Sequence, residues 1–251
     1  MTDPPVPPFF DDADFNSPLS DERAGRLVAS LGPLAHRRVV DLGCGWGELL
    51  LRVLEAEPAA TGLGVDLDAA AVDHARANAA RRGLDGRVTF LAEDAGRHLT
   101  EPADVVINIG SSHIWGDLDT DPTAAALKAI RAILPTGGRL LLGEMIWTRD
   151  PTADELTTMG MERDQCRSLP DLVDTTIGLG YRPLDLSQAT LDEWDRFESL
   201  HALGWEHWLL ENPGSPDAPE IRRKADEHRR RWLHGWRGPL GFGYLTLAAA
   251  P

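Results

Sequence analysis

The sequence has few cysteines, no long apolar run and a deficit of positive charge. Its 251 residues include 2 cysteines, which are too few for a disulfide framework or a cysteine-rich zinc site. It has no run of about eighteen apolar residues and no basic-then-apolar N-terminus, so we expect a cytoplasmic protein with no membrane partner. The net charge is −15, whereas a protein that binds nucleic acid normally presents a basic face. We therefore expect no nucleic-acid partner.

The stretch from residue 38 to residue 47, RVVDLGCGWG, carries most of the information. Two β-branched residues lead into Asp41, and glycines follow at the alternate positions Gly43, Gly45 and Gly47. This pattern predicts a buried strand that turns sharply into a helix. Glycines allow a ligand to lie against the main chain, and the helix start offers it free N–H groups. Nucleotide-type cofactors bind in this way to doubly wound α/β sheets.

The acids around this loop indicate which cofactor. The dinucleotide fingerprint requires a third glycine where this chain has Glu48, and a pyrophosphate would be repelled by Glu48 and Asp41. A cationic ligand such as S-adenosylmethionine would not be repelled. Here the chain resembles the class I S-adenosylmethionine-dependent methyltransferases, whose first motif is a strand ending in acid-x-Gly-x-Gly-x-Gly. Cys44 lies inside this loop, as a small buried residue or as one with a chemical role.

Acids that follow the next two strands extend the resemblance. Asp66 ends a short strand over residues 61–68, and its carboxylate can accept hydrogen bonds from both ribose hydroxyls. The alternative is that Asp66 caps the next helix, for which Asp68 is better placed. The resemblance implies that Asp94, after a third strand at 88–92, holds the adenine amino group. We expect three neighbouring residues to contact the cofactor as well: Leu67, Ala95 and Asn108.

The loops after the fourth strand (103–109) and the fifth strand (139–143) should face the transferable methyl group. His113 is the first candidate for a general base, since imidazole titrates in the useful range; the alternative is that it only orients the substrate. Glu144 is the second candidate. We expect Ser112, Trp115 and Trp147 to contact the substrate. No cluster has metal-ligand spacing, so no metal is expected.

Two segments lie outside the predicted core of residues 20–189 and 241–251. Residues 1–19, rich in proline and phenylalanine, form either a disordered arm or a cap over the active site. Residues 190–240 are rich in charged residues and tryptophan, and their sequence pattern has the period of an α-helix. They form either a helical hairpin packed on the sheet edge or a lid, with His201 and Trp205 lining the acceptor pocket.

Together these motifs predict an α/β, Rossmann-like three-layer sandwich. Its seven-stranded, mostly parallel sheet has the order 3-2-1-4-5-7-6, and a helical insertion precedes the last strand. The implied activity is transfer of a methyl group from S-adenosylmethionine to oxygen or nitrogen of a small molecule, by an enzyme that could form a homodimer. Asn108 is followed by Ile109 and Gly110 rather than by two prolines, which disfavours the branch that methylates adenine or glutamine amino groups.

Three alternatives stay open from the sequence. The loop also resembles that of the cyclopropane fatty-acid synthases, which would mean carbon methylation of a lipid-like acceptor, although the acidic charge opposes contact with anionic membranes. A nicotinamide-dependent oxidoreductase is disfavoured by Glu48. The third alternative is a cofactor-binding partner protein without catalysis.

Overall fold

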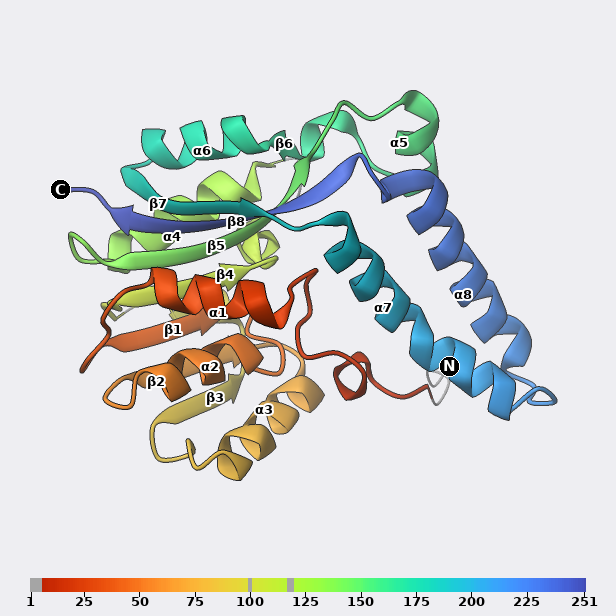
Figure 1. The fold of residues 1–251 in the computed structure, drawn as a ribbon, viewed down its shortest axis with the longest axis horizontal. Helices are drawn as coiled ribbons and strands as arrows, with labels where there is room; N and C mark the ends of the chain where they lie inside the picture. Colours follow the sequence, from red (N-terminus) through yellow and green to blue (C-terminus); the bar gives the residue numbers. More distant parts are fainter. Residues whose placement is uncertain (1–5, 99–100, 117–119) are drawn as a thin grey trace.

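A mostly parallel β-sheet forms the centre of the molecule (Figure 1). The computed structural model describes residues 6–98, 101–116 and 120–251. The strands are β1 (Arg38–Leu42), β2 (Thr61–Asp66), β3 (Val88–Ala92), β4 (Val105–Ile109), β5 (Arg139–Trp147), β6 (Arg167–Ser168), β7 (Tyr181–Gln188) and β8 (Leu240–Ala249). Their order is β3-β2-β1-β4-β5-β8-β7, with β8 antiparallel to both neighbours. The predicted fold class is confirmed, and so is the strand order, because the short extra strand β6 only shifts the last two numbers by one.

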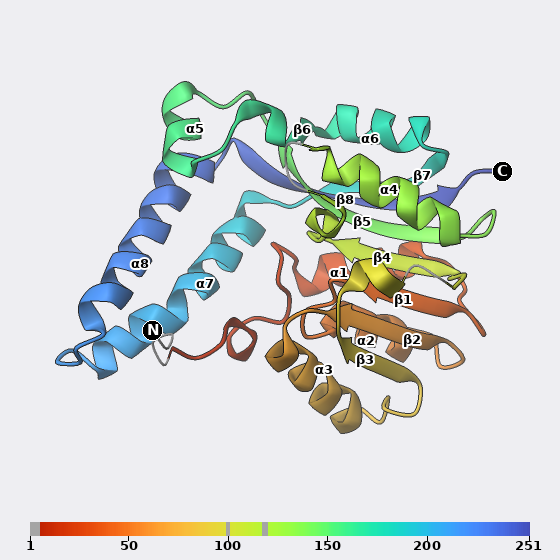
Figure 2. The ribbon, with the colours of Figure 1, turned by 180° about the vertical axis from the view of Figure 1, so that it is seen from behind.

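Helices cover both faces of this sheet (Figures 1 and 2). The α-helices are α1 (Asp21–Ser30), α2 (Glu48–Ala56), α3 (Ala69–Arg81), α4 (Pro122–Ile133), α5 (Ala153–Met159), α6 (Leu169–Gly178), α7 (Leu191–Glu211) and α8 (Ala218–Arg231). Short helical turns are η1 (Phe9–Asp11), η2 (Ala95–His98), η3 (Ser112–Trp115), η5 (Arg163–Gln165) and the π-helical η6 (Trp232–Trp236).

The alternation of apolar residues along the strands produces two hydrophobic cores. Val39 and Leu141 face one core together with residues of α1, α2 and α3. Val40 and Leu140 face the other core, which α4 and α6 complete. Strands buried on both faces in this way read as continuous apolar runs in the sequence, and the carboxyl ends of the parallel strands are left free at one edge.

Strand β5 extends further than the sequence predicted. The prediction ended it at Gly143, but β8 pairs with it along its whole length, up to the pair Trp147–Leu240. On the opposite edge of β5, pairing with β4 stops earlier, at the pair Ile109–Gly143, and the short strand β6 pairs only with Ile146 and Trp147. Glu144 therefore lies inside β5, beside the place where β4 has ended and the sheet opens.

Helices α7 and α8 form an antiparallel pair that projects from one end of the sheet (Figures 1 and 2). They fill the segment between β7 and β8 in which the sequence predicted a helical insertion. The N-terminal segment, described from residue 6 onward, runs between the far part of α7 and the body of the protein, and its residues 1–5 lie outside the described part. Within residues 6–98, 101–116 and 120–251, no helix has both the length and the apolar character needed to cross a membrane.

Candidate active site

The three glycines after β1 adopt backbone angles that disfavour other residues. The φ angles of Gly43, Gly45 and Gly47 are +75°, +52° and +73°. A Cβ atom on Gly43 would lie 2.4 Å from the Cβ of Ser111, and one on Gly47 would lie 2.5 Å from the ring of Phe90. The chain therefore turns here with its main chain closely packed against β3 and the loop after β4, and glycine is required at both positions.

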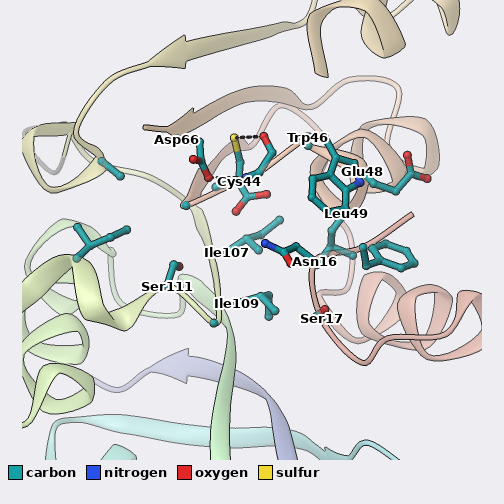
Figure 3. A pocket seen from close by; sticks show the side chains of 18 of the residues that line it. Asn16, Ser17, Cys44, Trp46, Glu48, Leu49, Asp66, Ile107, Ile109 and Ser111 are labelled. Carbon is teal, nitrogen blue, oxygen red and sulfur yellow. Dashed lines mark hydrogen bonds between the residues drawn. The ribbon is translucent and has the colours of Figure 1, made fainter. Parts of the chain in front are cut away.

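A cavity of about 590 Å³ opens beside this loop at the carboxyl ends of β1, β2 and β4 (Figure 3). Most of the predicted cofactor residues line it: Asp41, Gly43, Cys44, Gly45, Gly47, Asp66, Leu67, Asp94 and Ala95. The side chain of Leu67 is 75% exposed, so an apolar surface is available beside Asp66 for a ligand to cover. We refer to this cavity as the first pocket.

Asp66 holds the glycine loop and remains available to a ligand. Its Oδ2 accepts from the N–H of Gly45 at 2.7 Å, and its Oδ1 accepts from the N–H of Asp68 at 2.9 Å. The cap of α3 is Asp68, whose Oδ1 accepts from the N–H groups of Ala70 and Ala71. Because each carboxylate oxygen has more than one acceptor site, Asp66 can still receive hydroxyl groups from a ribose.

Asp41 is buried at the floor of the first pocket. Its side chain lies near Asp66, and burial together with the charge of Asp66 raises the pKa of Asp41 to about 8. A cation that enters the pocket relieves this repulsion, since an opposite charge favours the ionised carboxylate. The pocket thus combines a glycine cradle, an acid suited to hydroxyl groups and an acid that favours a cation, which fits S-adenosylmethionine.

The surroundings of Cys44 and Glu48 indicate structural rather than chemical roles. Burial raises the pKa of the Cys44 thiol, which keeps the sulfur protonated and unreactive. Glu48 forms ion pairs with Arg52 and Arg82, and its carboxylate points away from the pocket centre (Figure 3). The argument that Glu48 repels a pyrophosphate is therefore wrong, because two guanidinium groups neutralise it. Four further acids line the pocket: Asp14, Asp41, Asp66 and Asp94.

Asn108 was predicted to contact the cofactor, but the structure places it below the pocket surface. Its side chain is fully buried, and its Nδ2 donates to the hydroxyl of Ser111 at 2.6 Å and to the carbonyl of Leu42 at 3.4 Å. Its Oδ1 accepts from the hydroxyl of Ser112 at 3.0 Å. Asn108 thus ties the end of β4 to the end of β1.

A second pocket of about 430 Å³ adjoins the first. The two share Asn16, Ser17, Gly110 and His113 as lining residues, so each opens onto the same place at the end of β4. Three predicted residues lie in the second pocket: Ser112, His113 and Glu144. Its remaining wall comes from the segment around η5, the starts of α4 and α7, and parts of α6 and β8.

Among the acids that line the second pocket, Glu144 has the most strongly shifted pKa. Burial raises the pKa of its carboxyl to about 7, while a hydrogen bond from the Ser112 hydroxyl and the charge of Arg167 oppose the shift. The carboxyl shares hydrogen bonds with the hydroxyl groups of Ser112 and Thr123. Arg167 itself is paired with Asp121. A carboxyl group that titrates near neutral pH in a pocket is suited to accepting a proton.

The four aromatic residues predicted to contact the substrate do not line the second pocket. Trp115 packs against the core beneath α4. Trp147 is buried, and its Nε1 donates to the carbonyl of Arg163 at 2.7 Å, so it fixes the η5 segment that walls the second pocket. His201 and Trp205 line a different hollow, next to Phe9 and the N-terminal segment.

Sequence reasoning missed several residues that line the pockets. Asn16 and Ser17 border both pockets, and Trp194 and Phe197 of α7 border the second. The only signal for the first two was the possibility of a cap formed by residues 1–19. Trp194 and Phe197 precede His201 by one to two helical turns, and no local pattern indicates which turn of α7 reaches the pocket. In the described parts of the chain, no three His, Cys, Asp or Glu side chains are arranged to hold a metal ion.

Comparison with known proteins decides the family. The sequence model of a family described as methyltransferase domain matches residues 39–138. A crystal structure of an S-adenosylmethionine-dependent methyltransferase from Geobacter sulfurreducens, in complex with S-adenosyl-L-homocysteine, is 28% identical to this chain. The similarity covers 97% of this chain and 98% of that one, with a TM-score of 0.85. This chain is a class I S-adenosylmethionine-dependent methyltransferase.

Two further relatives match most of the chain. The methyltransferase is 29% identical over 237 residues to the protein YjhP of Escherichia coli, and this similarity covers 93% of each of the two chains. It is 28% identical over 204 residues to the 27-O-demethylrifamycin SV methyltransferase of Amycolatopsis mediterranei, covering 75% of this chain and 71% of that one. The cyclopropane synthase MmaA2 of Mycobacterium tuberculosis, at 16% identity and a TM-score of 0.65, shares the fold. The predicted cofactor is confirmed, and the nicotinamide and non-catalytic alternatives are set aside.

Proposed function

We propose that the methyltransferase transfers a methyl group to an oxygen or nitrogen atom of a small molecule bound in the second pocket. The observation that carries this proposal is the junction of the two pockets at Gly110 and His113, with Glu144 in the wall of the second. The volume of the second pocket, about 430 Å³, lies in the range typical of small-molecule sites. Trp194, Phe197 and Phe242 offer the acceptor an apolar aromatic surface.

In the proposed arrangement, Asp66 receives the ribose hydroxyls, and Asp94 the adenine amino group. Asp41 favours the cationic end of the cofactor. Bound S-adenosylmethionine supplies an electrophilic methyl group on a positively charged sulfur. The protein contributes by placing the acceptor beside the first pocket and excluding water, since alignment accounts for much of the catalysis of such displacements.

Glu144 would take the proton that the acceptor loses. When a hydroxyl or an N–H group gains a methyl group, its own proton must leave, and the ionised Glu144 carboxylate can accept it. Only the ionised form can do so; with a pKa of about 7, this form dominates above neutral pH. His113, exposed and shared by both pockets, would orient the acceptor or act as an alternative base.

The proposal is tested by incubating the enzyme with labelled S-adenosylmethionine and a library of small hydroxyl and amine compounds, with lipid-like alkenes as a separate set. Mass spectrometry and NMR of any product locate the new methyl group. Methylation at oxygen or nitrogen that is lost in Glu144→Gln supports the proposal. A product methylated at carbon contradicts it and favours the lipid-like alternative instead.

A further inference from the structure

A chain of buried hydrogen bonds connects Glu144 to the end of β1. The carbonyl of Leu42 accepts from the Ser111 hydroxyl at 2.6 Å, and the Ser111 oxygen accepts from Asn108 Nδ2 at 2.6 Å. Asn108 Oδ1 accepts from the hydroxyl of Ser112, which also touches Glu144 Oε1. Asn108, Ser111 and Ser112 are each less than 5% exposed, so water does not compete for these groups.

The orientation of the Asn108 amide follows from its neighbours. The Leu42 carbonyl can only accept a hydrogen bond, and the Ser111 hydroxyl already donates its single proton to it. The amide group that faces both oxygen atoms must therefore be the donor Nδ2. Consequently the acceptor Oδ1 faces Ser112.

The Ser112 hydroxyl has one proton and two neighbours that could accept it. If the proton points to Asn108 Oδ1, then Ser112 can only accept from Glu144, and the Glu144 carboxyl must carry a proton. If Glu144 ionises, the hydroxyl rotates toward the carboxylate, and the buried Oδ1 of Asn108 loses its partner. Leaving a buried acceptor without a partner is unfavourable, so the chain resists ionisation of Glu144.

We propose that Asn108 is a positioning residue that acts through Ser112 to keep the Glu144 carboxyl protonated in the resting enzyme. Its effect on catalysis rests on the proposed function, because it requires Glu144 to be the group that accepts the proton. Burial of Glu144 acts in the same direction and raises its pKa to about 7. Ionisation releases the Glu144 proton to solvent and turns the Ser112 hydroxyl toward the new carboxylate, with no other bond changed.

Other groups around Glu144 act on it independently of this chain. Asp121, at the start of α4, opposes its ionisation, and Arg167 of β6 favours it. Thr123 of α4 shares a hydrogen bond with it, and Cys166 lies close enough for its thiol to feel the Glu144 charge. His113 and Asp164 line the same pocket. None of these groups is changed in the variants below, so they form a constant background.

The test measures protonation directly and needs no acceptor. The free protein is labelled with ¹³C at the glutamate carboxyl groups, the Glu144 signal is identified by its absence in Glu144→Gln, and its titration is followed by NMR. The change Asn108→Leu keeps a similar shape but removes the acceptor, and frees the Ser112 proton for Glu144. We expect the titration midpoint to fall by about one pKa unit, a tenfold rise in the ionisation constant.

A double-mutant cycle separates this route from a general structural effect. In a Ser112→Ala background the coupling is cut, so adding Asn108→Leu should leave the Glu144 midpoint unchanged. Thr246→Val, another buried polar change in the sheet, should not move the midpoint in the wild-type background. If Asn108→Leu does not fold, Asn108→Ala is titrated under the same criteria.

The inference is overturned if the Asn108 variant leaves the midpoint unchanged or raises it, or if the shift persists without Ser112. Failure of the proposed function looks different: Glu144→Gln would then methylate an acceptor at the wild-type rate, while the NMR titration could still respond to Asn108. Once an acceptor is known, the acid limb of the pH profile of methyl transfer should move with the NMR midpoint in Asn108→Leu.

Discussion

The two pockets differ in how the chain builds them. The first pocket takes Asp41, Asp66 and Asp94 from the ends of three successive strands, β1, β2 and β3, which lie side by side in the sheet. The second pocket collects Ser112, Glu144, Trp194 and Phe242 from four distant parts of the chain, while the N-terminal segment borders both pockets. Cofactor binding therefore depends on local loop geometry, whereas acceptor binding depends on long-range packing. Mutations should separate the two.

The largest expected effect is a loss of methyl transfer with no loss of cofactor binding. Glu144→Gln removes the proposed base but preserves its shape, so we expect kcat to fall by about 10² to 10⁴-fold. In the wild type the rate should rise with pH through a midpoint near 7, as Glu144 ionises, and level off above it; the variant should lose this dependence. The affinity for S-adenosylhomocysteine, measured by calorimetry, should stay the same. A matching loss of cofactor affinity would contradict the separation of the two pockets.

A change in the glycine loop should produce the reverse pattern. Gly43→Ala forces a Cβ against Ser111 at a φ of +75°, and we expect S-adenosylhomocysteine affinity to fall by about 100-fold, through strain and overlap. Gly45→Ala is the matched control, because its φ is also positive but nothing lies within 4 Å of the added Cβ. Its loss should be about tenfold, from backbone strain alone. Equal losses in calorimetric titrations of the two variants would show that contact with Ser111 is unimportant.

Two tryptophans of α7 allow a finer comparison within the acceptor side. Trp194 lines the second pocket, so Trp194→Leu should raise the KM for the acceptor about tenfold by removing aromatic contact area. Trp205 lines the outer hollow near the N-terminal segment, and Trp205→Leu should lower the melting temperature with little change in KM. An acceptor KM that responds to Trp205 would extend the acceptor site along α7, as the sequence suggested.

The smallest expected effect is the release of a proton from Asp41 when the cofactor binds. The pKa of Asp41 is raised to about 8 in the free protein, so the carboxyl is mostly protonated at pH 7 and mostly ionised above pH 8. A bound cation favours the ionised form, so affinity for S-adenosylmethionine should rise about fivefold between pH 7 and pH 8. Calorimetry in buffers of different ionisation enthalpy should detect proton release at pH 7. Asp41→Asn should abolish both signals; a pH-independent affinity in the wild type would argue against contact with a cation.

The contrast between the pockets also explains what the sequence could predict. Asp41, Gly43, Asp66 and Asp94 occupy motifs that follow consecutive strands, and a strand end fixes the position of the next few residues. The fold followed from the same strands. Glu144 was placed at the pocket by this logic too, but the length of β5 was not predicted, because pairing with the distant strands β6 and β8 holds its last four residues.

The remaining differences come from long-range packing that the local pattern does not encode. Helical spacing placed Trp205 on one face of α7, but the packing of α7 against the N-terminal segment decides what that face meets. Similarly, Asn108 follows the strand pattern correctly, yet its side chain turns inward to Leu42, Ser111 and Ser112 rather than toward the cofactor. Side-chain direction at a strand end depends on partners far away in the sequence.

The placement of Asn16 and Ser17 between the two pockets matters for anyone who wishes to alter this enzyme. A substitution at either position changes the acceptor wall and the cofactor wall together, because both pockets touch both residues. Selection for a new acceptor that starts in this segment would therefore be constrained by loss of cofactor. Trp194, Phe197 and Phe242 border the second pocket without lining the first. A library built on these three aromatic positions should affect methyl-donor binding less than one at Asn16 and Ser17, and is the better start for redesigning specificity.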